Sequence, residues 1–103
     1  MANDREHIER VKLALEHLHN CTAIYRATVP VREVFRGQTV WEGDVEVFDL
    51  TGHQKAKRAY GWSETPPNGE RFFAVLETPQ IKSALDAVRA SIVADAKKEK
   101  PNR

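Results

Sequence analysis

Three potential metal ligands, His17, His19 and Cys21, fall within five residues of one another. Imidazole nitrogens and thiolates are common ligands of zinc and of other borderline metals. Residues two apart on a helix point about 200° away from each other, so the three side chains converge only if a helix ends near His17. No C-x-x-C pair offers a fourth ligand. We therefore predict two histidines at a helix end beside a buried thiol, with no metal and no other cofactor.

A second stretch, residues 52–62 (GHQKAKRAYGW), mixes cations with aromatic rings. Such a surface can follow a nucleic-acid backbone and stack on its bases. The candidate ligand-binding or nucleic-acid-binding residues are His53, Lys55, Lys57, Arg58, Tyr60 and Trp62. The segment before them carries only acids among its charged residues, namely Glu42, Asp44, Glu46 and Asp49. Ion pairs across a hairpin explain the bases without a ligand, and we favour them over nucleic-acid binding.

Signatures of catalysis are sparse. Ser63, Ser83 and Ser91 belong to no nucleophile-elbow motif, and the chain has neither a phosphate-binding glycine loop nor an H-E-x-x-H motif. His53 on a turn could act as a general base, since imidazole titrates near neutrality, with Tyr60 beside it in a dimer cleft. We assign no catalytic residues and keep a small enzyme of this kind as a second alternative.

The size and composition indicate an ordinary soluble protein. The chain has 103 residues, which suits one domain, and 41% of them are hydrophobic. No apolar run approaches the roughly 18 to 20 residues that span a bilayer. Sixteen basic and fifteen acidic residues leave a net charge of +1, which gives no strong field to attract nucleic acid. The N-terminus lacks an apolar signal segment and the chain has one cysteine, so we expect a cytoplasmic protein without a membrane partner.

The pattern of apolar residues predicts two helices with four strands between them. Ile8, Val11, Leu15 and Leu18 repeat at helical spacing within 4–19. Thr78 and Pro79 resemble a helix cap and first turn, followed by an apolar stripe that reaches about residue 96. Segments rich in β-branched and aromatic residues lie at 22–35, 39–50, 55–63 and 71–77. We expect a single domain over 1–96 and a disordered basic tail over 97–103.

Short connections between the strands predict an antiparallel meander, because parallel neighbours need long crossovers. The fold class is therefore α+β, in the order α-β-β-β-β-α, as a two-layer sandwich with both helices on one face of the sheet. A turn centred on Gly52 and His53 would place Val45 opposite Tyr60. The side that carries Tyr60 and Trp62 should then face the helices, and the side that carries Glu46 should face away from them.

The fourth strand is apolar on both sides, which suggests that something covers the second face of the sheet. A second copy of the chain is the simplest cover, so we predict a homodimer. The candidate interface residues are Tyr25, Val29, Val31, Phe48, Phe73 and Val75. The sequence as a whole predicts a non-enzymatic, self-associating binding module and identifies no particular ligand.

Overall fold

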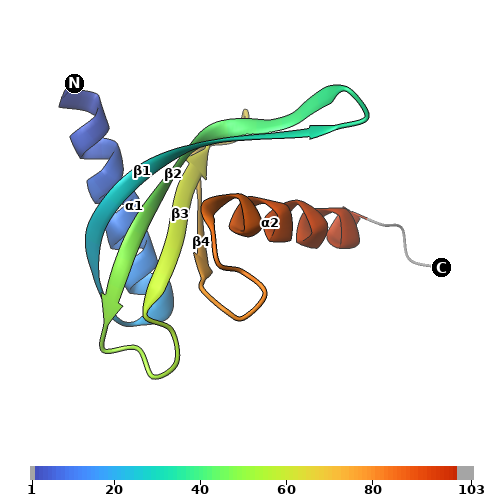
Figure 1. Ribbon diagram of the computed structural model, residues 1–103. Coiled ribbons are helices and arrows are strands. Elements are labelled where there is room, and N and C mark those ends of the chain that lie inside the picture. The colour runs from blue at the N-terminus through green and yellow to red at the C-terminus, as the bar shows by residue number, and fades with distance from the viewer. Residues whose placement is uncertain (1, 100–103) are drawn as a thin grey trace.

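Four strands form one antiparallel sheet in the computed structural model of the protein (Figure 1). The structure describes residues 2–99 and the side chains of residues 5–95. Its strands lie in the order β1-β2-β3-β4, so each connection joins neighbours. The elements are α1 (Ala2–His19), β1 (Thr22–Phe35), β2 (Gln38–Thr51), β3 (Arg58–Glu64), β4 (Arg71–Leu76) and α2 (Ala84–Glu99). The α+β class, the element order and the meandering sheet are confirmed.

Residues with a positive φ mark the sharp reversals of the chain. Asn20, with a φ of 53°, ends α1, as expected of a residue that tolerates the left-handed region. Arg36 and Gly37, with φ values of 54° and 78°, form the two-residue turn between β1 and β2. Pro30 lies in β1, which is an edge strand, where a residue without an N–H is tolerated.

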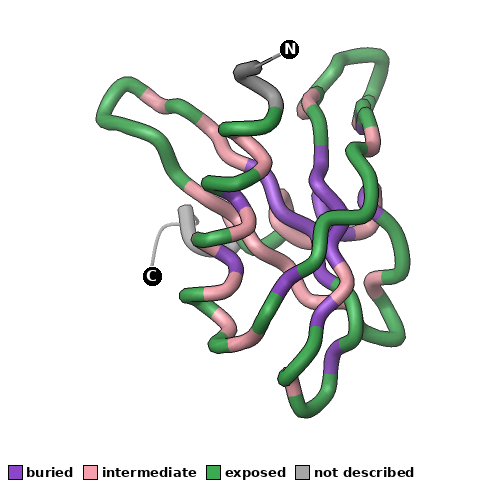
Figure 2. Tube along the Cα trace, turned by 90° about the vertical axis from the view of Figure 1, so that its left-hand side faces the viewer, coloured by how far each residue is buried: buried purple, intermediate pink, exposed green. Residues whose placement is uncertain are grey.

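The two helices lie on opposite faces of the sheet, so the prediction that they share one face is wrong (Figure 1). On the first face, α1 packs its buried Val11 and Leu15 against Phe48, Leu50, Ala59, Phe72 and Ala74. On the second, α2 packs its buried Ala87 and Val88 against Val45, Val47, Tyr60, Trp62 and Val75. Both faces carry apolar side chains, and a helix on each face removes both sets from water. Buried positions accordingly run along the middle of the sheet (Figure 2).

The register between β2 and β3 differs by two residues from the predicted one. Val47, not Val45, lies opposite Tyr60, and Asp49 lies opposite Arg58. The loop 52–57 accounts for this difference in register, because β3 begins only at Arg58. Within the loop, His53 Nδ1 accepts hydrogen bonds from the backbone N–H groups of Lys55 and Ala56. Side chains alternate with a period of two, so a shift of two leaves every residue on its predicted side of the sheet.

The second helix begins later than the sequence suggests. Thr78 and Ile81 exchange two backbone hydrogen bonds in a tight turn, whereas Ser83 caps α2 by accepting the N–H of Asp86. The helix continues to Glu99, beyond the predicted end, and residues 100–103 of the predicted tail lie outside the described residues. In the described part of the chain, neither helix has the length and apolar character needed to cross a membrane.

Candidate functional site

A cleft of about 400 Å³ opens on the α1 side of the sheet, beside the first turns of that helix. It is lined mainly by polar side chains, although the sheet around it is apolar. The lining residues are His7, Ile8, Tyr25, Thr28, Asp44, Glu46 and Ser63. We call this hollow the His7–Glu46 cleft.

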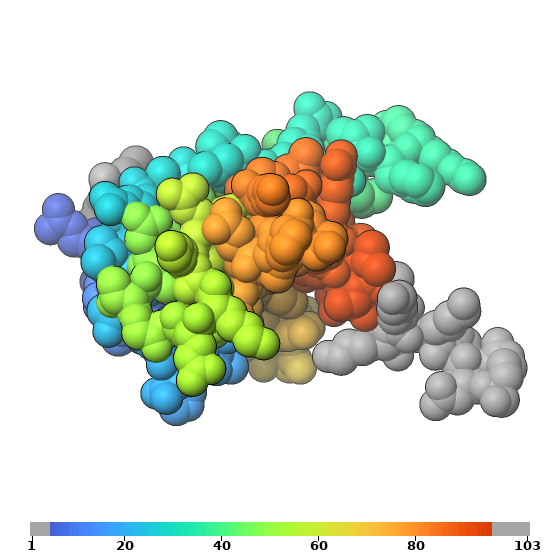
Figure 3. Space-filling view, turned by 60° about the horizontal axis from the view of Figure 1, so that its bottom comes forward, coloured from blue at the N-terminus to red at the C-terminus, as the bar shows by residue number. Residues whose placement is uncertain are grey.

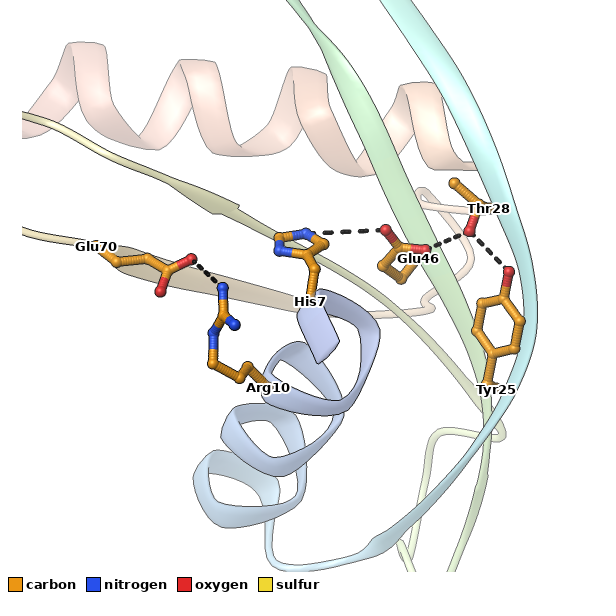
Figure 4. Close-up of polar contacts among 6 residues, drawn as sticks. All are labelled: His7, Arg10, Tyr25, Thr28, Glu46 and Glu70. Atoms are coloured by element: carbon orange, nitrogen blue, oxygen red, sulfur yellow. Dashed lines mark hydrogen bonds and ion pairs between the residues drawn. The ribbon is translucent and has the colours of Figure 1, made fainter. Parts of the chain in front are cut away.

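Glu46 is the buried charged residue at the base of the cleft, with 2% of its surface exposed. It lies on β2 on the same side as Phe48, which places its carboxylate beneath α1. The Thr28 hydroxyl donates a hydrogen bond to Glu46 Oε1, and the Tyr25 hydroxyl lies 2.7 Å from Thr28 Oγ1 (Figure 4). Because the Thr28 proton points to Glu46, the Tyr25 hydroxyl donates to Thr28. A chain of donors thus leads from exposed Tyr25 to the carboxylate.

A β-bulge brings Tyr25 and Thr28 to the same side of β1. Residues three apart on a regular strand point to opposite faces of a sheet. The register of β1 shifts between Tyr25 and Ala27, so that Tyr25 lies opposite Phe48 and Thr28 lies opposite Glu46. The Tyr25 ring also contacts the Phe48 ring edge to face, at 6.1 Å between centroids. The irregularity in the strand is therefore what builds this wall of the cleft.

His7 reaches the cleft from α1. It lies one turn before Val11, which is buried against the sheet, so its imidazole projects on the same side of the helix. His7 Nε2 lies 3.9 Å from Glu46 Oε2 (Figure 4). The carboxylate therefore has Thr28 at one oxygen and an imidazole near the other.

An ion pair between Arg10 and Glu70 lies near the cleft. Arg10 lies 3.3 Å from Glu70, whose pKa is lowered by hydrogen bonds from Ser63 and Arg10 (Figure 4). This arginine is therefore engaged with a carboxylate outside the cleft. Inside it, Asp44 and Glu46 give a negative field, and hydroxyl groups supply further hydrogen-bonding partners. The arrangement suits a ligand that donates hydrogen bonds and carries positive charge.

The residues proposed from the 52–62 segment lie elsewhere and do not form one surface. Lys55 and Lys57 are exposed, and Arg58 forms an ion pair with Asp49 across β2 and β3, as the charge pattern predicts. Tyr60 and Trp62 are 2% and 1% exposed in the α2 core. Burial, and then the neighbouring charge of Glu77, raise the pKa of Tyr60. These two rings therefore pack inside the protein and are not available for stacking.

The histidines near the end of α1 have separate surroundings. His19 Nε2 lies 3.1 Å from the carbonyl oxygen of Ala74, and its ring meets that of His53 edge to face at 6.3 Å. Burial, and then the charge of Glu16, raise the pKa of the Cys21 thiol. Within residues 5–95, His17, His19 and Cys21 do not converge into a group that could hold a metal ion.

The six candidate interface residues lie mostly inside one chain. Val31 and Phe48 are buried, whereas Tyr25 is exposed at the cleft. Val29, Phe73 and Val75 are partly buried against the α2 core. The face of the sheet opposite Tyr60 and Trp62, whose apolar residues led to the dimer prediction, is covered by α1 of the same chain. A homodimer therefore needs a different surface from the one first proposed.

Sequence reasoning did not identify the His7–Glu46 cleft. The usable signal was Glu46 itself, an acid within the largely apolar segment 45–50, but it was assigned to the face of the sheet turned away from both helices. Only the placement of α1 on that face shows that Glu46 is buried and that His7 is its neighbour. Compared with known proteins, the chain matches no protein-family model, no curated protein and no solved structure.

Proposed function

We propose that this protein is a binding module that holds a small ligand with a protonated nitrogen in the His7–Glu46 cleft. The observation that carries the proposal is Glu46, a carboxylate that is 2% exposed and faces a hollow of about 400 Å³. A carboxylate forms a charged hydrogen bond with a protonated nitrogen, and such bonds are stronger than those between neutral groups. Thr28 and His7 hold the Glu46 side chain from β1 and α1, beside the hollow where such a nitrogen would lie.

The shape and lining of the cleft support a ligand of modest size. Its volume lies within the range of about 300 to 1,000 Å³ that is usual for small-molecule sites. Ile8 and the Tyr25 ring give an apolar wall for a carbon skeleton, while Asp44 and Glu46 lie where a cationic end would be held. Amines with a short apolar or aromatic body combine both properties.

The proposal is tested by nuclear magnetic resonance titration with benzylamine and with benzyl alcohol, which has a similar shape but no charge. We expect saturable shifts at the amides of residues 7, 8, 28 and 46 with the amine and much smaller ones with the alcohol. Glu46→Gln should weaken amine binding by roughly tenfold or more, since a charged hydrogen bond contributes about 1.5–3 kcal/mol.

Glu9→Gln is the matched control, because it removes the same charge from an exposed position on α1. Equal binding of alcohol and amine, or equal affinity in Glu46→Gln and in the unmodified protein, would contradict the proposal. So would the lack of any saturable shift at these amides.

Self-association and a cytoplasmic location stay predictions. The cleft is formed by residues of one chain, so ligand binding does not require a second copy. Nucleic-acid binding through residues 53–62 is a weaker candidate, because it would rely on exposed lysines without the two buried rings. An enzyme that uses His53 and Tyr60 has similarly little support, since His53 Nδ1 already accepts two backbone N–H groups.

A further inference from the structure

Lysines from two separate loops line a hollow of about 540 Å³ at the end of the sheet where β2 turns into β3 and β4 leads to α2. The two loops, residues 52–57 and 77–83, lie side by side on the surface (Figure 3). The residues that line the hollow are Lys55, Ala56, Lys57, Glu77, Thr78, Pro79 and Lys82. We call it the lysine hollow.

The ladder between β3 and β4 brings the two loops together. The N–H of Glu77 donates a hydrogen bond of 2.9 Å to the carbonyl oxygen of Arg58, which extends the ladder beyond Leu76. Partners on antiparallel strands move in opposite directions along the chain, so the next step brings Lys57 alongside Thr78. The lysines of the first loop therefore meet the segment that precedes α2.

Backbone hydrogen bonds and one buried side chain hold the first loop in place. The N–H of Leu50 donates to the carbonyl oxygen of Lys57 at 2.9 Å, and the N–H of Ala56 donates to His53 Nδ1 at 2.9 Å. Ala56 is buried against the α1 side of the sheet, so Lys55 and Lys57 on either side of it project away from the core and are exposed. This wall of the hollow is thus carried by an ordered backbone.

The second loop is held by a tight turn. Thr78 and Ile81 exchange two backbone hydrogen bonds of 3.1 Å, and Lys82 follows this turn. Thr78 Oγ1 accepts the N–H of Gln80, so the hydroxyl proton is directed elsewhere and is available to a ligand. The carboxylate of Asp86 accepts the backbone N–H of Lys82 and lies outside the lining of the hollow. The second wall therefore adds one ammonium group and one hydroxyl donor.

The charge of the hollow is positive. Within residues 5–95, the side chains of Lys55, Lys57 and Lys82 form no ion pair. Glu77 is the acid of the lining, and its Oε2 accepts a hydrogen bond from the Tyr60 hydroxyl, 3.4 Å away. The lining thus carries a net charge of +2, whereas the whole chain carries +1. Like charges that are held together repel, and an anion bound between them relieves this repulsion.

We propose that the lysine hollow binds a small phosphate monoester. A phosphate monoester carries about −1.5 to −2 charges at neutral pH, which matches the charge of the lining. Ammonium groups bind phosphate as point charges and donate hydrogen bonds to its oxygens. The volume leaves room for an attached organic group, for which Ala56 and Pro79 supply apolar contacts.

This site is separate from the His7–Glu46 cleft. The lysine hollow lies between two loops at one end of the sheet, and the cleft lies beside the first turns of α1. The two linings have no residue in common, and they carry opposite charges. Binding of a phosphate monoester and binding of an amine can therefore succeed or fail independently.

Nuclear magnetic resonance titration with phenyl phosphate tests the proposal, with benzenesulfonate as a probe of similar shape that carries one negative charge. We expect saturable shifts at the amides of residues 55, 57, 78 and 82 with phenyl phosphate, and weaker binding of benzenesulfonate. Lys57→Gln and Lys82→Gln, which lie in different loops, should each raise the dissociation constant of phenyl phosphate by roughly fivefold or more, because each removes a charge beside the phosphate. Both lysines are exposed, so both variants should keep the circular dichroism spectrum of the folded protein.

Lys12→Gln is the matched control, because it removes the same charge from α1, outside the lining of the hollow. Shifts that do not saturate, or that sodium chloride reproduces at the same ionic strength, would overturn the proposal. Equal binding of phenyl phosphate and benzenesulfonate, unchanged affinity in both hollow variants, or an equal loss in Lys12→Gln would overturn it as well. Tighter binding of a single-stranded oligonucleotide, whose phosphodiesters carry one charge each, would overturn it in favour of a nucleic-acid surface.

Discussion

Val11 of α1 packs directly over Gly61 of β3, so closely that a Cβ built on Gly61 would lie 2.6 Å from Val11 Cγ1. Glycine at this position lets the helix approach the sheet. We predict that Gly61→Ala lowers the free energy of unfolding by about 1–3 kcal/mol, the usual cost of overpacking a core. Urea denaturation measures the change. In a Val11→Ala background the same substitution should cost less, since the opposing methyl groups are gone, and an equal cost would show that the contact is not the cause.

Glu64 joins two tryptophans of the α2 core. Its Oε2 accepts hydrogen bonds from Trp41 Nε1 at 2.9 Å and Trp62 Nε1 at 3.3 Å. Glu64→Ala would leave the N–H of the buried Trp62 without this acceptor, so we predict a loss of about 1–3 kcal/mol in unfolding free energy. Glu64→Gln keeps an acceptor oxygen and should cost clearly less. Tryptophan fluorescence during urea unfolding reports on both variants, and an equal loss in the two would contradict this role.

The sequence predicted the elements better than it predicted their arrangement around the sheet. The period of apolar side chains depends on local conformation, which is why the order of the helices and strands and the meandering sheet were correctly inferred. The face that each helix covers depends on contacts between distant segments. A short antiparallel sheet that is apolar on both sides accepts a second helix as readily as a second chain.

The candidate site depends even more than the fold on contacts between distant segments. Thr28 and Tyr25 reach Glu46 only because a bulge changes the alternation of β1, and that bulge left no glycine or other clear mark in the sequence. His7 becomes a neighbour of Glu46 only through the packing of α1 on that face of the sheet, which the helical spacing of apolar residues does not specify. The cationic and aromatic residues of the 52–62 segment were therefore a poorer indicator of the candidate site than the buried carboxylate of Glu46.

His53 organises the loop between β2 and β3. Its Nδ1 accepts the backbone N–H groups of Lys55 and Ala56 at 3.1 and 2.9 Å, which requires that nitrogen to be unprotonated. We predict that His53→Ala speeds hydrogen exchange at these two amides on the order of tenfold, since each bond contributes about 1 kcal/mol. His53→Asn should retain part of the protection, because the Asn oxygen can accept similar bonds. Unchanged exchange in His53→Ala would exclude this role.

Asp49 ties three strands together through its carboxylate. Arg26 of β1 and Arg58 of β3 both contact it, and hydrogen bonding to Arg26, aided by Arg58, lowers the pKa of Asp49 below its ordinary value. A carboxyl group whose pKa is lower in the folded state stabilises that state above its ordinary pKa. The contribution is lost as the pH falls through the lowered pKa. The stability of the protein should therefore decrease on acidification in part through Asp49.

Asp49→Asn tests this pH dependence by urea denaturation at neutral and at acid pH. We expect the variant to be less stable than the unmodified protein at neutral pH, with the difference shrinking as the pH falls below the ordinary pKa of an aspartate, because the wild-type carboxylate then becomes protonated. Glu42→Gln is the control on the same strand, where the exposed Glu42 forms no ion pair within the described part of the chain. A stability difference for Asp49→Asn that stays constant across the pH range, or one that Glu42→Gln reproduces, would show that the two arginine contacts do not set the acid sensitivity of the fold.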